Sequence, residues 1–300
     1  MAIDAFLLIL SMFALGYLFA RLKALPENAA DVLNRVVLHL CLPAAVLLSI
    51  PRLHFEWRLL GLAITPWLAG ILAVGLVRLV CRAPRFRRDE YAVLLLCVAL
   101  GNTGFIGYPV IRALLGEHAQ AYAVIYDQFG TFLMLSTYGL FVCARFGGNA
   151  PPSPVVILGR IARFPPAWAL LIGLTLMPAA PPEWLARLLE SLAQAMLPLV
   201  MLAVGFSLRF QLPRGEMRAL ALGLFLKLLA LPALAWGFSL LIGLKGEMLR
   251  ANVLETAMPP MITAAALAVA HNLAPRLAAA LAGYGILCAL FTLPFWMWLL

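Results

Sequence analysis

The chain has 300 residues, of which 64% are hydrophobic and 12% are charged, and its mean hydropathy is +0.99. A soluble domain carries about 45–50% apolar residues and about twice this share of charged ones, so a soluble fold could not keep so many apolar side chains from water. The net charge of +9 comes from basic residues strung between apolar stretches, a topology signal rather than a nucleic-acid-binding pattern. Composition therefore predicts an all-α polytopic membrane protein that binds no nucleic acid.

Ten segments are apolar and long enough to span a bilayer, which takes about 20 residues in a helix. In chain order they are 3–20, 32–50, 59–80, 90–115, 119–144, 156–178, 185–207, 217–242, 249–271 and 276–300. The connections between them are short, apart from a Gly-, Asn-, Pro- and Ser-containing segment at 146–154. This segment lies at the midpoint and is predicted to be a linker on the cytoplasmic side.

The basic residues predict the orientation of the chain. Fourteen Lys and Arg residues lie in or beside the loops after odd-numbered spans, and five lie in or beside the loops after even-numbered spans. Because loops rich in Lys and Arg stay in the cytoplasm, the odd loops are expected inside and both termini outside. We expect a multi-pass protein of the cytoplasmic (inner) membrane with periplasmic termini.

The two halves of the chain, 1–145 and 155–300, hold five predicted spans each and share the positions of their prolines. The matching prolines are Pro43 and Pro198, Pro66 and Pro232, and Pro109 and the pair Pro259–Pro260. An odd number of spans in each half turns the second copy upside down in the membrane. Inverted repeats with interrupted helices at matching positions are typical of secondary transporters.

Spans four and nine contain residues that interrupt a helix. Span four carries three glycines and a proline within nine residues, namely Gly101, Gly104, Gly107 and Pro109. In span nine, Pro259 and Pro260 free the carbonyls of Glu255 and Thr256, because proline has no N–H. Such backbone is tolerated in a membrane only where protein or a wet cavity covers it. We expect the breaks to cross near the midplane, where half-helix N-termini attract a carboxylate.

Three ionisable residues lie deep in apolar spans: Asp127 in span five, Lys227 in span eight and Glu255 in span nine. Each costs about 2.5–3.5 kcal/mol at a helix centre, so a functional role is the default interpretation. One reading makes Asp127 or Glu255 a proton-coupling carboxylate and Lys227 an attraction for anions. The other is a structural ion pair between Lys227 and one of the two carboxylates.

Motifs for other chemistry are missing from the sequence. The five cysteines are far apart, and none of the four histidines has a second ligand at metal-type spacing. There is no H-E-x-x-H, no G-x-S-x-G and no Gly-x-Gly-Asp to complete an intramembrane aspartyl protease. We therefore expect neither an enzyme nor a metal site, and the lack of charged rings or a soluble sensing domain argues against a channel or receptor.

The segment from Gly101 to Pro109, which reads Gly-Asn-Thr-Gly-Phe-Ile-Gly-Tyr-Pro, resembles the first crossover helix of the auxin efflux carrier family. This family contains bacterial permeases related to the plant auxin exporters. Ala257-Met258-Pro259 and the apolar run that follows it, to Asn272, are similar to the second crossover. The resemblance extends over essentially the whole chain.

The resemblance implies a ten-helix inverted-repeat fold that is shared with bile-acid/sodium symporters. Spans 1, 2, 6 and 7 would form a scaffold, and spans 3–5 and 8–10 a transport domain that moves as an elevator. A homodimer in the lipid bilayer is expected, carrying small organic anions such as auxin-like indole carboxylates or malate- or malonate-like dicarboxylates. No cofactor is implied. Coupling to Na⁺, coupling to H⁺ and uncoupled flux stay open, as does a sodium-coupled carrier of another solute.

The resemblance also implies substrate-binding residues. The first-crossover Asn of the family matches Asn102, whose amide can donate to a carboxylate or only cap the broken helix. Thr103 shares this location, and Gln128 matches a polar family position that faces the crossover. Where plant members have a polar residue after the second-crossover proline, this chain has Pro260, which leaves backbone groups and Thr263 for contacts.

Overall fold

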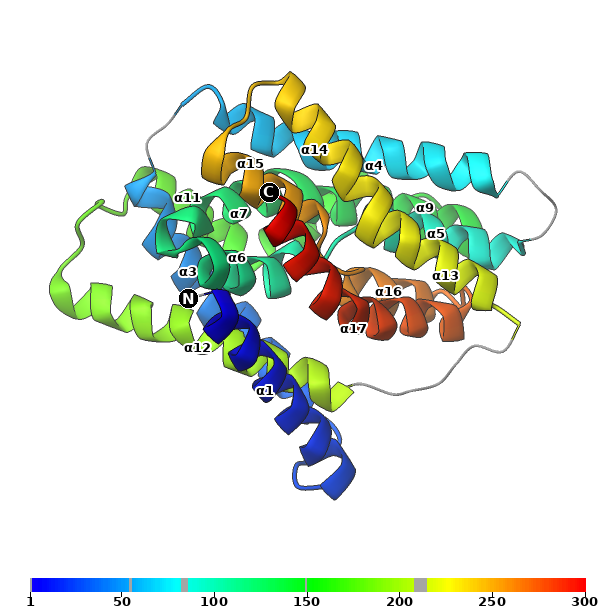
Figure 1. Ribbon diagram of the computed structural model, residues 1–300, viewed down its shortest axis with the longest axis horizontal. Coiled ribbons are helices and arrows are strands. Elements are labelled where there is room, and N and C mark those ends of the chain that lie inside the picture. Colours follow the sequence, from blue (N-terminus) through cyan, green and yellow to red (C-terminus); the bar gives the residue numbers. More distant parts are fainter. Residues whose placement is uncertain (1, 54–55, 82–85, 149, 208–214) are drawn as a thin grey trace. The chain divides into compact units, whose positions relative to one another are not determined.

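The computed structural model describes residues 2–53, 56–81, 86–148, 150–207 and 215–300, and Figure 1 shows that they form helices. The α-helices are α1 (Ala2–Leu22), α2 (Ala29–Val36), α3 (Leu42–Ser49), α4 (Leu59–Val80), α5 (Arg88–Ala99), α6 (Tyr108–Leu115), α7 (Gln120–Tyr126), α8 (Phe132–Met134), α9 (Leu140–Gly147), α10 (Pro154–Ala162), α11 (Pro165–Thr175), α12 (Glu183–Ser207), α13 (Met217–Phe225), α14 (Leu231–Leu241), α15 (Gly246–Thr256), α16 (Ile262–Ala270) and α17 (Pro275–Leu299). These described residues contain no strand, so the all-α prediction is confirmed. The loop residues Arg82, Arg85, Asn149, Arg209 and Arg214 lie outside the described residues.

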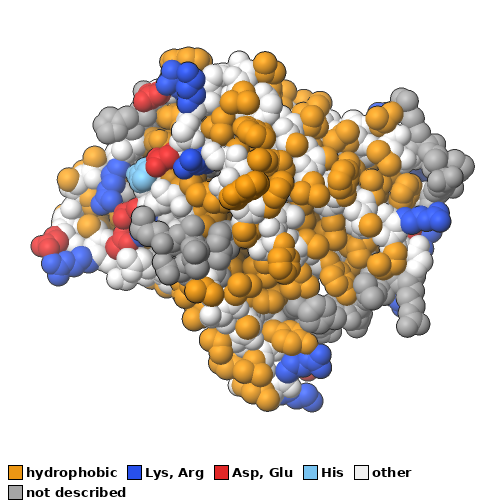
Figure 2. Space-filling model, viewed as in Figure 1, with side chains coloured by type: hydrophobic (Ala, Val, Ile, Leu, Met, Phe, Trp, Pro, Cys, Tyr) orange, Lys and Arg blue, Asp and Glu red, His pale blue; other side chains and the backbone are white. Residues whose placement is uncertain are grey.

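Six helical stretches among the described residues are long and apolar enough to cross a membrane. They are Ala29–Arg52, Leu59–Val80, Glu117–Gly147, Glu183–Ser207, Met217–Leu241 and Pro275–Leu299. They coincide with predicted spans two, three, five, seven, eight and ten. Hydrophobic side chains also cover much of the surface seen in Figure 2, as expected where lipid replaces water.

The other four predicted spans are helical too, although they are not among these six. Span one corresponds to α1, a helix of 21 residues, and span six is divided into α10 and α11. Span four divides into α5 and α6, and span nine into α15 and α16. A polytopic membrane protein is supported, whereas ten crossings in two inverted repeats stay a prediction.

Several long helices contain π-helical turns: η1 (Val37–Cys41), η5 (Asp127–Thr131), η6 (Leu135–Gly139) and η7 (Leu226–Ala230). The turn η7 ends two residues before Pro232. Since Pro232 has no N–H, the carbonyl of Leu228 loses its α-helical partner. The buried indole of Trp296 donates to this carbonyl at 2.9 Å, so α17 satisfies the backbone group that the proline leaves free.

The chain forms two compact units that interleave along the sequence. The first unit comprises Met1–Glu56, Gly104–Val124 and Ala162–Arg209, and the second comprises Trp57–Thr103, Ile125–Ile161 and Phe210–Leu300. Predicted spans one, two and seven belong to the first unit and spans three, eight, nine and ten to the second, while spans four, five and six are divided. Each unit draws on both halves of the chain. The repeat boundaries and the scaffold and transport roles therefore stay predictions.

In the first unit, α1 and α12 cross at very short range. A Cβ atom on Gly16 would collide with the carbonyl oxygen of Leu202, and one on Gly205 with that of Phe13. The two glycines thus allow the backbones of the two helices to be in direct contact, as small residues do between membrane helices. The helix α12 also contacts α2 and α3, and α3 packs against α11.

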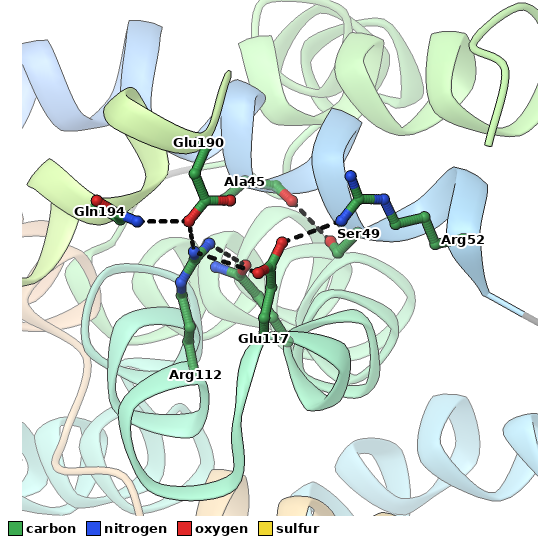
Figure 3. A network of polar contacts seen from close by, with 8 residues as sticks. Ala45, Ser49, Arg52, Arg112, Glu117, Glu190 and Gln194 are labelled. Carbon is green, nitrogen blue, oxygen red and sulfur yellow. Dashed lines mark hydrogen bonds and ion pairs between the residues drawn. The ribbon is translucent and has the colours of Figure 1, made fainter. Parts of the chain in front are cut away.

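A polar network in the first unit joins α6 to α12 (Figure 3). Arg112 of α6 forms an ion pair with Glu190 of α12. Its guanidinium also lies 3.8 Å from the carboxylate of Glu117, which in turn accepts a hydrogen bond of 3.1 Å from Arg52. Gln194 donates to Glu190 at 2.7 Å. The chain after the break in span four is therefore anchored by charge.

The second unit has α5 at its centre. Leu94, Leu96 and Leu100 are fully buried, and α5 contacts α4, α9, α13, α16 and α17. After its charged first turn, the helix is apolar on every side from Ala92 onward, and such a segment belongs in the interior of a bundle. The site described below is built around the end of this helix.

Candidate functional site: two paired helix breaks

Both breaks lie in the second unit and pair with each other. After α5 the backbone is extended through Gly101 and Asn102, and after α15 it is extended around Pro259 and Pro260. Gly101 and Pro260 form an antiparallel bridge. The Asn102 N–H donates to the Pro259 carbonyl at 2.8 Å, and the Met261 N–H donates to the Leu100 carbonyl at 2.9 Å. Each break therefore satisfies backbone groups of the other.

The residues at the breaks explain why the backbones come so close. A Cβ on Gly101 would lie 2.9 Å from Nζ of Lys227, and a Cβ on Gly285 would lie 2.5 Å from Cδ of Pro260. Only glycine fits at either position without a displacement. The sequence predicted an interruption between Gly101 and Pro109, and the break lies at the start of this segment, whereas Pro109 lies inside the continuous helical stretch Thr103–Leu115. The interruption is at Gly101, and Gly104 and Gly107 lie in the π-helical turn η3 (Thr103–Gly107).

Lys227 is buried and donates from Nζ to the Thr256 carbonyl at 2.9 Å. This is one of the two carbonyls that the prolines free, and it lies at the negative end of the α15 dipole. Among the described residues no carboxylate lies within 4.0 Å of this ammonium. Lys227 therefore caps a broken helix, and no direct ion pair joins it to Asp127 or Glu255.

Asp127 lies in the π-helical turn η5 and is well supplied with donors. The Thr103 hydroxyl donates to its Oδ1 at 2.6 Å, and the Gln128 amide donates to its Oδ2 at 3.0 Å. All three side chains are buried. Two of the predicted substrate-binding residues, Thr103 and Gln128, thus direct a donor at Asp127, which links the start of η3 to η5.

Glu255 differs sharply from Asp127. Its side chain is 0% exposed, and within the described residues neither carboxylate oxygen has a hydrogen-bond partner. Burying an anion without donors is expensive, whereas a neutral carboxyl group is accommodated at far lower cost. Of the two carboxylates that the sequence singled out, Glu255 is the one that accepts no hydrogen bond from the described residues.

A buried polar cluster next to Glu255 was missed by the sequence analysis. The Asn252 amide donates to the Ser239 hydroxyl at 2.7 Å and to the Thr65 hydroxyl at 3.2 Å. The Thr256 hydroxyl donates to the Asn252 carbonyl at 2.9 Å and lies 3.0 Å from the Tyr126 hydroxyl. A signal was present in the sequence, because Asn252 lies three residues before Glu255 and so shares its side of the helix.

Asn102 offers a donor that nothing in the described residues accepts. Its side chain is 2% exposed, and its Nδ2 has no hydrogen-bond partner within this part of the chain. The α16 helix begins just after the paired Met261, and the first-turn N–H groups of residues 262–264 have no intrahelical acceptor. Thr263 belongs to that turn and is exposed. The paired breaks thus bring together an amide donor and a helix N-terminus.

The described residues contain no group of three or more His, Cys, Asp or Glu side chains that could hold a metal ion. The five cysteines are free thiols.

Comparison with known proteins agrees with this membrane architecture. A family model described as "membrane transport protein" matches residues 1–297. An "uncharacterized transporter" of Methanothermobacter thermautotrophicus is 30% identical over 296 residues, which cover 98% of this chain and 96% of that protein. The "uncharacterized transporter YfdV" of Escherichia coli K12 is 24% identical over 305 residues, 97% of this chain and 95% of that protein.

A further relative carries a substrate in its name. The "putative malonate transporter" of Rhizobium meliloti is 30% identical over 209 residues, which cover 65% of this chain and 62% of that protein. These relatives are named as transporters and not as enzymes. The match over nearly the whole length confirms the resemblance found in the sequence: the chain belongs to the membrane transport protein family, the family of the auxin efflux carriers.

Proposed function

We propose that this membrane transporter is a secondary carrier of small organic anions, with carboxylates of the malonate, malate or indole-acetate type as substrates. The observation that carries the proposal is the buried amide donor of Asn102, which has no acceptor among the described residues. A buried donor left unsatisfied costs about 1–3 kcal/mol, and a carboxylate oxygen would satisfy it. The name of the Rhizobium relative supports the same chemical class.

The proposed site combines Asn102 with the N-terminus of α16. A carboxylate at this position would accept from the Asn102 amide and from first-turn N–H groups beside Thr263, and the helix dipole would favour its charge. The two paired breaks belong to one compact unit. We propose that the substrate travels with this unit in an elevator-type alternation between the two sides of the membrane.

The same site bears on the coupling ion. Sodium sites at interrupted membrane helices use freed carbonyls and half-helix C-terminal ends. Here the Lys227 ammonium already binds the freed Thr256 carbonyl at 2.9 Å. The residue directly before Thr256 is Glu255, whose buried carboxyl group accepts no hydrogen bond from the described residues. We therefore propose that the carrier couples to protons through Glu255 and needs no Na⁺, which leaves a sodium-coupled carrier as the less favoured alternative.

The substrate proposal is tested by counterflow of radiolabelled malonate, malate and indole-3-acetate in proteoliposomes. Wild type should exchange at least one of them saturably. Asn102→Asp keeps the side-chain size but replaces the donor by a repelling oxygen, so exchange should fall about tenfold or more, the equivalent of about 1.4 kcal/mol. The exposed Asn28 provides the matched control, since Asn28→Asp should exchange normally.

Two results would reject this proposal. If wild type exchanges none of the carboxylates but exchanges a neutral or cationic solute, the substrate class is wrong. If Asn102→Asp exchanges a carboxylate as fast as wild type, the site is elsewhere.

A further inference from the structure

Two arginines of the second unit share one aromatic ring. The Cζ atom of Arg88, the first residue of α5, lies 5.6 Å from the centroid of Phe146, and that of Arg145 in α9 lies 5.9 Å from it. Arg88 also donates to the Arg145 carbonyl at 3.4 Å. Tyr91 holds the ring in place from its edge, with centroids 5.8 Å apart and planes at 67°. Two positive charges are thus kept close together by contacts with Phe146.

Neither guanidinium has a carboxylate partner among the described residues. The acidic residues nearest in sequence are already used, because Asp89 and Glu216 bind Arg87 at 2.9 and 2.8 Å and Glu90 caps the start of α5. The structure does not describe the adjoining residues 82–85 and 149, and in the sequence none of these is Asp or Glu. Two like charges at close range are stabilised when an anion lies between them, and Arg is well suited to bind phosphate.

We propose that Arg88 and Arg145 bind the phosphate of an anionic phospholipid headgroup. The position favours a lipid over a soluble phosphate. Arg145 lies in the last turn of the apolar span Glu117–Gly147. Phe141, one turn earlier on the same helical side, is 54% exposed and provides a surface for an acyl chain. Both arginines lie on the predicted cytoplasmic side, where anionic lipids attract basic residues.

The test is thermal unfolding of the full-length protein in neutral detergent, with added phosphatidylglycerol or phosphatidylcholine of the same acyl chains. Phosphatidylglycerol should raise the Tm of wild type more than phosphatidylcholine does, since only a lipid that binds the native state stabilises it. The double variant Arg88→Gln/Arg145→Gln should lose most of this difference. Arg58 is the matched control, because it lies over Trp57 at 6.0 Å near the predicted external side, and Arg58→Gln should keep the difference.

Four outcomes would overturn the proposal. Wild type could respond equally to both lipids, or soluble glycerol phosphate could give the same Tm shift and so identify a site for a free anion. The double variant could keep the full preference for phosphatidylglycerol, which would place the lipid elsewhere. Finally, added salt could leave the preference of wild type for phosphatidylglycerol unchanged. Salt screens the attraction between a phosphate and exposed arginines, so a site formed by Arg88 and Arg145 requires that the preference becomes weaker. The three comparisons made on wild type can overturn the proposal even if the double variant fails to fold, and none of the four outcomes depends on transport.

Discussion

Lys227 illustrates how a charge lies deep in an apolar span without a carboxylate beside it. Pro260 removes one N–H from span nine, which leaves the Thr256 carbonyl without a helical partner. The Lys227 ammonium takes that place from span eight at 2.9 Å, and the negative end of α15 adds to the attraction. A proline in one span and a lysine in another thus compensate each other.

Replacing Lys227 by methionine tests this compensation. Lys227→Met keeps much of the side-chain volume but leaves the Thr256 carbonyl without a donor, so we expect a loss of about 1–3 kcal/mol in stability. The loss is measured as a lower Tm in detergent. Lys245→Met, at an exposed loop position, should leave the Tm unchanged. An unchanged Tm for Lys227→Met would mean that the carbonyl does not depend on this lysine.

The sequence identified the unusual residues of the site but not their partners. Asp127, Lys227 and Glu255 stood out because charges are costly in apolar spans. Their contacts join residues far apart in sequence, with 24 positions between Thr103 and Asp127 and 29 between Lys227 and Thr256. Such pairs depend on which spans pack together, which hydropathy does not encode. Composition therefore left an ion pair and a functional charge equally open, and the contacts reveal a helix cap.

At the scale of elements, the crossing of α1 and α12 depends on two glycines. Gly16 and Gly205 each lie against a carbonyl oxygen of the other helix, with no room for a Cβ. Nothing in the hydropathy pattern distinguishes them from glycines that face open space. One such glycine is Gly75 of α4, which has no atom within 4 Å of its would-be Cβ among the described residues.

Alanine substitutions at these glycines should therefore change the Tm in different directions. Gly16→Ala and Gly205→Ala force two backbones apart, and overpacking of this kind typically costs about 1–3 kcal/mol. Gly75→Ala meets nothing and adds helix propensity, so its Tm should be equal to or slightly above that of wild type. Thermal unfolding of the three variants in one detergent makes the comparison. Equal Tm values for Gly205→Ala and Gly75→Ala would contradict the close crossing.

The sequence predicted the two helix breaks but not how they pair with each other. The glycines and prolines of spans four and nine indicated two interruptions, and both occur. The interruption in span four lies at the Gly101 end of the predicted segment, and the helix resumes at Thr103, so that Pro109 lies inside the stretch Thr103–Leu115. The pairing of Gly101 with Pro260 involves hydrogen bonds between segments about 160 residues apart, and no local rule predicts it.

At the scale of the whole molecule, a carrier must link the occupancy of its site to a driving ion. The second unit holds Asn102 with an unpaired donor and Glu255 with an unpaired carboxyl group. In the proposed mechanism a proton neutralises the buried carboxylate of Glu255 for one direction of movement. Exchange of substrate for substrate then needs no net proton transfer, whereas net uptake does.

Glu255→Gln separates these two activities, because glutamine has the same size and cannot exchange a proton. The variant should retain counterflow of the carboxylate that wild type exchanges, but an imposed pH gradient should no longer drive its net uptake. Replacing Na⁺ by K⁺ on both sides should change neither activity in wild type. Glu183→Gln, which alters an exposed carboxylate on α12, is the matched control and should respond to the pH gradient normally. Uptake by Glu255→Gln that still follows the pH gradient would exclude Glu255 as the proton carrier. A requirement for Na⁺ in wild type would instead favour the sodium-coupled alternative, in which the Lys227 ammonium would have to leave the Thr256 carbonyl so that a cation could bind there.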